Sequence, residues 1–335
     1  MNRRDFTRSG LAGVAALAMP RFASTAQAQN AAARGYRYIH LDVFTDKRLQ
    51  GNQLYVFTQP AGLDTETMQT LTRESNLSEC TFVFPPEAAG TEHRVRIFTR
   101  TAETPFAGHP TIGTAFALAH TGVLKPGTAR TVFGLGVGPT NVDLEWKDGT
   151  LAFAWMTQLK PTFGKAIADG AAVAAAIGLD ASASGAKANV PAGQEVNCGS
   201  NFFIVPLATR KAVDAAVLDR AKVDAIFAAT GIQRRGLYVF STERAQDDAT
   251  AYSRLLSAGG IEDPATGSAA GPAGSFAAKY GLAGGGADAT IVFLQGVLVR
   301  RPSRINVRIG KTGDEITSVK VGGSSVVVGE GTMAT

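Results

Sequence analysis

A short run near the C-terminal end, residues 263–269 (DPATGSA), combines an acid, a proline, a glycine and a hydroxyl residue. Residues 109–115 (HPTIGTA) fit the same template, with a histidine in place of the acid. Each run opens a stretch of small residues that favours a helix, and a proline just inside a helix start, behind a polar residue, is a common arrangement. Because helix N-termini have unpaired N–H groups and a partial positive charge, two such ends are suited to hold a small carboxylate-bearing molecule between two halves of a protein.

The polar side chains of these runs are suited to proton chemistry or to substrate binding. His109 lies at a positive helix end, which disfavours the imidazolium and suits a neutral hydrogen-bonding histidine; a capping histidine is the alternative. Asp263 is a good N-cap by type, and capping alone would explain it. Ser268 falls in the first turn, where its hydroxyl and the N–H groups of Gly267 and Ser268 can face a ligand carboxylate, and the glycine allows close approach.

A further carboxylate stands in residues 76–80 (NLSEC), between a predicted helix and a predicted strand. At such a junction Glu79 can be pushed partly into an apolar wall, which raises the pKa of a carboxyl toward neutrality, as a general acid/base requires. The alternative is a surface glutamate that ends a helix. Glu79 is the candidate for the proton carrier.

Other kinds of site are not indicated. The sequence has no Walker loop, no H-E-x-x-H motif and no zinc-type cysteine spacing. The glycines at 134, 136 and 138 precede a strand instead of opening a helix, so they do not form a dinucleotide site. Residues 267–269 (GSA) lack the G-x-S-x-G pattern of a hydrolase. We therefore expect an enzyme that uses neither a cofactor nor a metal.

The alternation of apolar residues predicts the elements that carry these side chains. A capping aspartate and apolar spacing predict a helix over residues 64–75, and an Ala-rich helix is predicted over residues 167–177. Strands are predicted over residues 36–44, 54–57, 81–84, 94–99, 141–146, 151–156, 202–207, 237–240, 251–256, 290–299, 305–309 and 319–328. Asp148-Gly149 favours a tight hairpin turn between the fifth and sixth of these strands.

The two halves of the chain repeat an order of elements. In each half a strand with a basic residue, Arg96 or Arg254, feeds the helix that the template run opens. Matching strand–loop–helix blocks indicate a duplicated half-domain. The alternative is chance, because a chain rich in Gly, Ala, Pro and Ser repeats such a template easily.

Residues 1–28 have the features of an export signal. A twin-arginine pair, Arg3-Arg4, precedes Phe6; an uncharged stretch over residues 9–20 and an A-x-A cleavage signal over residues 26–28 follow. The stretch is too short to span a bilayer. We expect export through the twin-arginine pathway to the periplasm or the medium, with no membrane attachment after signal removal. An amphipathic helix of the mature domain is the alternative.

Composition narrows the functional classes. The 335 residues are 45% hydrophobic and 18% charged, which is ordinary globular composition with room for two domains. The export segment carries a net +3 of the formal +5, and no Lys/Arg run interleaves with aromatics, so nucleic acid is not an expected partner. Cys80 and Cys198 are expected as separate buried residues, with a disulfide as the alternative in an oxidising compartment.

Several motifs together resemble those of the phenazine-biosynthesis PhzF-like family. They are DVFT at 42–45 with Gly51-Asn52, NLSE at 76–79, PFAGHP at 105–110, EDPATGSA at 262–269, QG at 295–296 and RPS at 301–303. They run in order over about residues 38–331, essentially all of the chain that follows the export signal. EDPATGSA and FAGHP are highly specific together.

The resemblance implies an α+β fold of the diaminopimelate-epimerase type. This fold has two similar domains, each a curved mixed β-sheet or barrel wrapped around a central helix, with the active site in the cleft between them. The domains would be residues 34–157 and 158–331, with the final strand packed back on the first domain. Family members characterised as isomerases move a proton within a dihydro-hydroxyanthranilate without a cofactor.

The resemblance also implies roles for particular residues. The glutamate of N-L-S-E, Glu79 here, is the acid/base, and His109, Asp263 and Ser268 map onto substrate-positioning residues. We add Asn52 and the N–H groups of Gly108 and Gly267 to the expected substrate-binding set. The related epimerases place a cysteine at each helix start, which this chain does not, so a two-thiol racemase is not expected.

Three departures from the family pattern affect the function expected of this chain. Gln53 replaces the proline that usually follows Gly-Asn, and residues 300–302 read Arg-Arg-Pro where Gly-Arg-Pro is commoner. The third departure is the export signal, because phenazine synthesis is cytoplasmic. We expect a cofactor-independent isomerase that shifts a proton on a different small anionic substrate with a carboxylate, and a homodimer is a further expectation. The alternatives are an amino-acid-type epimerase and an exported, non-catalytic small-ligand-binding protein.

Overall fold

Alternating apolar side chains and tight turns build most of the chain into β-strands. The computed structural model describes residues 34–233, 236–256, 262–283 and 288–335, so the predicted export signal lies outside the described residues. Within them seventeen strands belong to one hydrogen-bonded network. The pairings divide this network into a first and a second series of strands.

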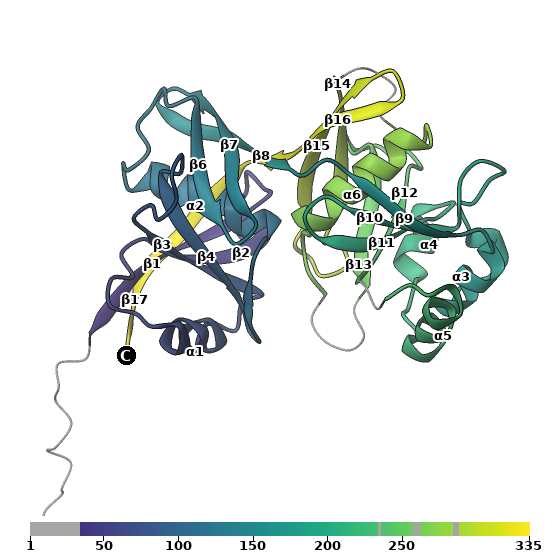
Figure 1. The fold of residues 1–335 in the computed structure, drawn as a ribbon, viewed down its shortest axis with the longest axis horizontal. Helices are drawn as coiled ribbons and strands as arrows, with labels where there is room; N and C mark the ends of the chain where they lie inside the picture. Colours follow the sequence, from purple (N-terminus) through teal and green to yellow (C-terminus); the bar gives the residue numbers. More distant parts are fainter. Residues whose placement is uncertain (1–33, 234–235, 257–261, 284–287) are drawn as a thin grey trace, which may run out of the picture. The chain divides into compact units, whose positions relative to one another are not determined.

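The strands of the first series surround helix α2 (Gly108–His120), which Figure 1 shows passing between them. In pairing order they are β17 (Ser325–Ala334), β1 (Gly35–Val43), β2 (Asn52–Phe57), β3 (Glu79–Phe84), β4 (His93–Thr99), β6 (Arg130–Leu135), β7 (Gly138–Lys147) and β8 (Thr150–Gln158). Only β2–β3 and β4–β6 pair in parallel. Helix α1 (Thr65–Ser75) joins β2 to β3, and the short β5 (Glu103–Thr104) and α2 join β4 to β6.

The second series surrounds helix α6 (Gly267–Lys279) in the same manner. In pairing order its strands are β9 (Thr162–Ile167), β10 (Gly193–Asn197), β11 (Asn201–Pro206), β12 (Gly236–Ser241), β13 (Ala251–Leu256), β14 (Asp288–Gln295), β15 (Ser303–Thr312) and β16 (Glu315–Gly323). Helices α4 (Arg210–Ala215) and α5 (Arg220–Thr230) join β11 to β12, and α6 joins β13 to β14. Helix α3 (Gly170–Ala176) and the short η1 (Ala181–Ala183) lie between β9 and β10.

The two series match strand for strand. The parallel pairs β11–β12 and β13–β14 stand where β2–β3 and β4–β6 stand in the first series, and a helix crosses over each pair. Pairing of β8 with β16 links the series. This arrangement confirms the predicted α+β class with curved sheets around central helices. The predicted domain boundary at residues 157 and 158 stays a prediction.

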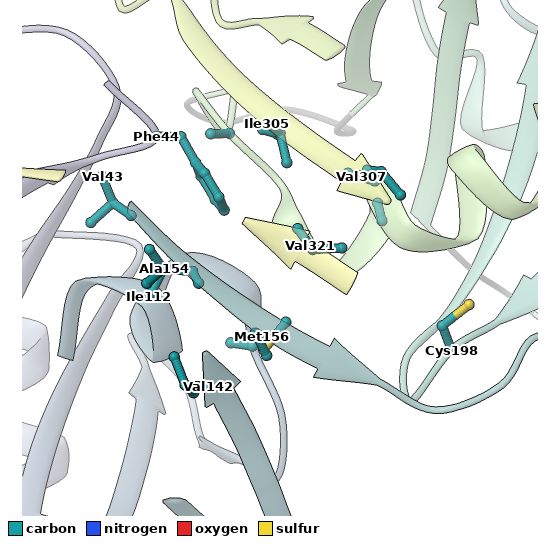
Figure 2. Packing of buried hydrophobic residues seen from close by; sticks show 14 of the residues in the cluster. Val43, Phe44, Ile112, Val142, Ala154, Met156, Cys198, Ile305, Val307 and Val321 are labelled. Carbon is teal, nitrogen blue, oxygen red and sulfur yellow. The ribbon is translucent and has the colours of Figure 1, made fainter. Parts of the chain in front are cut away.

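The central helices are buried because they are made of small and apolar residues. In α2 every residue from Gly108 to Leu118 is buried, and in α6 every residue except Ser268 and Lys279 is buried. A hydrophobic cluster packs around them, and Figure 2 labels ten of its members, including Phe44, Ile112 and Ile305. A cluster this continuous leaves few positions where a polar side chain can lie without a partner.

Local sequence signals set several element ends. Asp64 caps α1 by accepting a hydrogen bond from Thr67 N at 2.7 Å. Asp148 (φ 50°) and Gly149 (φ 76°) make the turn between β7 and β8, as predicted from the Asp-Gly pair. None of the described helices is both long enough and apolar enough to cross a membrane.

Several predicted elements differ from the structure. The strand predicted over residues 290–299 ends at Gln295, as β14. The helix predicted over residues 167–177 is only the seven-residue α3, because Ile167 ends β9, a strand that the sequence did not predict. The strand predicted over residues 319–328 is broken into β16 and β17. The carbonyl of Ser324, between them, accepts hydrogen bonds from Phe44 N at 2.9 Å and Thr45 N at 3.2 Å, which interrupts the strand.

Candidate active site

The two central helices begin against one another. Helix α2 begins at Gly108 and α6 at Gly267, and each has 13 residues. A Cβ placed on Gly108 would lie 2.6 Å from the Cα of Gly267 and 2.7 Å from the backbone nitrogen of Ser268. Only a glycine allows two backbones to approach this closely. Two positive helix ends and two sets of unpaired N–H groups therefore meet at one place.

This contact gives the internal repeat a register that differs from the predicted one. The chain reads Glu-x-Pro-x-x-Gly both at residues 103–108 and at residues 262–267, and each glycine begins a central helix. His109 therefore corresponds to Ser268. The predicted correspondence of His109 with Asp263 is wrong, because the glycine and not the proline marks the equivalent helix position.

Asp263 and Pro264 precede α6, so the predicted helix start at this proline is wrong. The N-cap of α6 is Thr266, and Asp263 does not cap the helix. The buried side chain of Gln295 holds this segment outside the helix: its Nε2 donates to Asp263 O at 2.9 Å, and its Oε1 accepts from Thr266 N at 3.1 Å. The carboxylate of Asp263 is consequently directed to other side chains.

Asn52, the first residue of β2, connects these side chains. Its amide nitrogen donates to Asp263 Oδ1 at 2.6 Å and to Ala265 O at 2.9 Å, and it lies 3.1 Å from His109 Nδ1. The second oxygen of Asp263 accepts from Thr266 Oγ1 at 2.7 Å. Asn52 is only 2% exposed, and its amide nitrogen already faces three acceptors of the protein itself. Its role in substrate binding stays a prediction.

Glu79 faces His109 from the first residue of β3. Helix α1 ends at Ser75, and Asn76 takes a left-handed conformation (φ 53°) that turns the chain toward the strand. Glu79 Oε2 lies 3.2 Å from His109 Nδ1, and the side chains of Glu79 and His109 are 19% and 3% exposed. The junction between helix and strand thus places this carboxyl inside the protein, beside the start of α2.

The two carboxyls of the site have different pKa values. Burial, and then the nearby charge of Asp263, raises the pKa of Glu79 to about 8. Burial raises the pKa of Asp263 to about 6, although hydrogen bonds from Thr266 and Asn52 favour its ionised form. At pH 7 Glu79 is therefore mainly protonated and Asp263 mainly ionised. Carboxyls whose pKa values are separated in this way are suited to proton transfer.

His109 is a neutral ring at any physiological pH, because burial lowers its pKa to about 3. Its Nδ1 lies 3.1 Å from the amide nitrogen of Asn52 and 3.2 Å from the carboxyl of Glu79. When the protonated carboxyl of Glu79 donates to Nδ1, the ring proton is on Nε2. Within the described residues Nε2 is buried and has no hydrogen-bond partner. A buried donor without a partner is available to a bound molecule.

Ser268 is the second residue of α6 and is partly exposed. Within the described part of the chain its hydroxyl makes no hydrogen bond to a protein group. The carbonyl of Gly267 accepts from Gln158 Nε2 at 3.0 Å, which fixes the first peptide of the helix. The first N–H groups of α2 and α6 have no acceptor within their helices. These groups are suited to bind a carboxylate.

A pair of matched ion pairs, which the sequence reasoning missed, precedes the two helix starts. Arg96 pairs with Glu103 through Nε at 2.8 Å and Nη2 at 2.6 Å; Arg254 pairs with Glu262 through the same atoms at 3.0 and 2.8 Å. Each glutamate opens the Glu-x-Pro-x-x-Gly repeat. The signal is present in the sequence, since Arg96 and Arg254 each precede a Glu-x-Pro-x-x-Gly run.

The cysteines do not belong to this group. Cys80 and Cys198 are free and buried, as expected, and burial raises their pKa values to about 11 and about 12. Neither stands at a helix start, and a thiol with such a pKa is a poor proton acceptor at pH 7. Among the described residues no group of three or more His, Cys, Asp or Glu side chains is arranged to hold a metal ion.

Comparison with known proteins shows the family of the chain. The family described as phenazine biosynthesis-like protein, PhzC-PhzF, matches residues 41–331. The trans-2,3-dihydro-3-hydroxyanthranilate isomerase of Pseudomonas aeruginosa is 34% identical over 301 residues, which are 88% of this chain and 98% of that protein. An uncharacterized isomerase of Mesorhizobium japonicum is also 34% identical, over 88% of this chain and 97% of its own length.

Solved structures show the same fold. The phenazine biosynthesis protein of the PhzF family from Bacillus anthracis superimposes with a TM-score of 0.77 at 23% identity, over 90% of this chain and 99% of that one. The hydroxyproline epimerase of Agrobacterium vitis superimposes with a TM-score of 0.60 at 12% identity, over 90% of this chain and 91% of that one. The chain belongs to the phenazine biosynthesis-like PhzF family and is an isomerase.

Proposed function

We propose that this isomerase moves a proton between two carbon atoms of a small carboxylate-bearing molecule, without a cofactor, and that Glu79 carries the proton. The observation that carries the proposal is the position of Glu79: its carboxyl is largely buried, lies 3.2 Å from a neutral histidine, and stands where two helices begin against one another. A carbon acid needs a base of raised pKa beside it and a positive environment for the electrons that remain.

The reaction follows from these groups in two proton transfers. The ionised carboxylate of Glu79 removes a proton from one carbon, and the electron pair moves into the conjugated system that ends in the substrate carboxylate. The N–H groups at the starts of α2 and α6 stabilise this enolate-like charge, with the Ser268 hydroxyl and His109 Nε2–H as further donors. The protonated Glu79 then returns the proton to another carbon, so the product is an isomer.

Asp263 supports this cycle by its charge. The ionised Asp263 raises the pKa of Glu79, which makes the Glu79 carboxylate a stronger base. It also accepts a donor group of the substrate, and Asn52 and Thr266 hold it in place. General acid/base catalysis of this kind accelerates a reaction by roughly 10²–10⁴-fold.

Deuterium incorporation tests the proposal. The purified protein is incubated in D₂O with trans-2,3-dihydro-3-hydroxyanthranilate, the substrate in the name of the Pseudomonas relative, and with a panel of small carboxylates selected by thermal shift. We expect deuterium at carbon in the recovered molecule with the wild type, and a loss of roughly 10²-fold or more with Glu79→Gln. Glu74→Gln, an exposed glutamate in α1, is the matched control. Binding without deuterium uptake by the wild type would show a ligand-binding protein, and full activity in Glu79→Gln would exclude Glu79 as the carrier.

A further inference from the structure

Arg301 is not one of the side chains that we propose to take part in the reaction, but it binds the two residues directly before Asn52. Its Nε donates to Gly51 O at 2.8 Å and its Nη2 to Gln50 O at 2.7 Å. In return, Gly51 N donates to Pro302 O at 3.2 Å. Three hydrogen bonds therefore connect the turn after β14 with the two residues that precede Asn52.

The guanidinium of Arg301 is held in place by a buried acid. Its Nη2 also pairs with the carboxylate of Asp42, which is only 1% exposed. The other oxygen of Asp42 accepts from Leu49 N at 2.6 Å. Because a buried carboxylate without a cation is costly, Arg301 and Asp42 hold each other, and together they close the loop between β1 and β2.

The backbone at Gly51 cannot compensate for a loss of these contacts. Gly51 has φ +69°, and a Cβ there would lie 2.3 Å from Val43 O, so the turn requires glycine. A glycine is conformationally free unless something binds it, and here the binding comes from Arg301 and Pro302. The direction in which Asn52 enters β2 therefore depends on residues from the second series of strands.

The site is sensitive to the direction of Asn52. The amide nitrogen has two hydrogens but three acceptors within 3.1 Å, namely Asp263 Oδ1, Ala265 O and His109 Nδ1. A small rotation of this side chain removes a donor from Asp263 or from His109.

We propose that Arg301 is a positioning residue of this isomerase, which fixes residues 50–51 so that the Asn52 amide stays on Asp263 and His109. Its effect on turnover rests on the proposed function, but its effect on Asp263 can be measured without substrate. The other ionisable groups that face Asp263 are Glu79, Glu262, His109 and Tyr238, and within the described residues none of them hydrogen-bonds to Arg301.

The test compares two conservative substitutions. Arg301→Lys keeps a positive charge beside Asp42 but cannot present the planar fork that reaches Gly51 and Gln50 together. Arg210→Lys is the matched control, because Arg210 makes a bidentate pair with Asp247 at 2.6 and 3.0 Å and is 15% exposed, against 19% for Arg301. The readouts are the melting temperature, kcat and KM for deuterium exchange, and the Asp263 pKa from carboxyl ¹³C NMR, assigned with Asp263→Asn.

We expect Arg301→Lys to raise the Asp263 pKa by about one unit, because a lost donor disfavours the ionised form, and to lower kcat roughly tenfold with little change in KM. Arg210→Lys should lower the melting temperature and leave the pKa and kcat unchanged. A wild-type Asp263 pKa in Arg301→Lys would overturn the proposal, as would equal changes in both variants. A wild type with no exchange activity would instead count against the proposed function, while the NMR result still decides the role of Arg301. If Arg301→Lys does not fold, the double variant Arg301→Gln/Asp42→Asn removes both charges of this ion pair, and the proposal is judged by the Asp263 pKa of that variant.

Discussion

Gly108 and Gly267 touch through their backbones, at the first residues of the two central helices. The Cα of Gly267 stands 2.6 Å from where a Gly108 side chain would begin, and a Cβ on Gly267 would in turn meet the ring of Phe44 at 2.8 Å. Neither residue has the left-handed conformation in which glycine is favoured. Space, and not backbone conformation, therefore requires glycine at both positions.

The first prediction follows from this contact. Gly108→Ala places a methyl group inside the backbone of the other helix start, which must move by about 1 Å. We expect kcat/KM to fall roughly 10²-fold, because displacements of this size misplace the reacting groups, and the free energy of unfolding to fall by about 1–3 kcal/mol. Gly329→Ala is the control, since no atom of the described residues lies within 4 Å of a Cβ at that position. Wild-type kinetics of Gly108→Ala, measured by deuterium exchange, would mean that the helix contact does not matter for catalysis.

The second prediction concerns pH and rate. Glu79 must be ionised to remove a proton and has a pKa of about 8, and Asp263 is ionised above its pKa of about 6. Therefore kcat/KM should rise about tenfold per pH unit between about pH 6 and pH 8 and level off above pH 8. Asp263→Asn removes a negative charge that raises the Glu79 pKa, so the rising limb should move to lower pH. The exposed Asp248 provides the control, and Asp248→Asn should leave the profile in place. A limb that stays near pH 8 in Asp263→Asn would contradict the electrostatic coupling of the two carboxyls.

The third prediction concerns pH and stability. The usual pKa of a glutamate is 4.5, and that of folded Glu79 is about 8. Below pH 4.5 the Glu79 carboxyl is protonated in both the folded and the unfolded chain, so it does not lower the free energy of unfolding. As the pH rises from 4.5 to 8, only the unfolded chain releases this proton, which favours unfolding. Glu79→Gln should therefore gain stability over the wild type with rising pH, by an amount on the order of 4 kcal/mol at pH 8.

Urea unfolding at pH 4 and at pH 8 measures this gain. Glu74→Gln, which changes an exposed carboxyl, should show the same stability difference from the wild type at both pH values. If Glu79→Gln shows no larger gain at pH 8 than at pH 4, the carboxyl of Glu79 is ionised normally and its role as a base of raised pKa is excluded. Loss of activity together with increased stability is typical of residues that serve a reaction at the expense of the fold.

Local signals in the sequence predicted most of the elements that position the site. Asp64 caps α1 and Asp148-Gly149 forms the β7–β8 turn, because these features depend on a few neighbouring residues. The predicted start of α6 is too early, because it depends on distant residues. Gln295 and Asn52, both distant in sequence, bind the segment from Asp263 to Thr266 and keep it out of the helix, and no local pattern reports such contacts.

The candidate site was only partly predictable for the same reason. The residue type and the junction between helix and strand identified Glu79, but its proximity to His109 is a tertiary contact. The electrostatic coupling of Glu79 to Asp263 likewise joins two segments that only the folded chain brings together. The sequence shows Arg96 and Arg254 as matching basic residues. Their partners, Glu103 and Glu262, correspond to each other only when the two helix starts are aligned by their glycines.

The pairing of β17 with β1 has a consequence for biosynthesis. Strand β1 is paired on one side by its neighbour β2, and on the other by residues 325–334, with Arg37 opposite Thr332. Contacts between such distant segments slow folding, and an open strand edge invites wrong pairing in the meantime. Most strands of the first series are translated early, but β1 has no partner on this side until β17 has been synthesised, so its edge stays open until then.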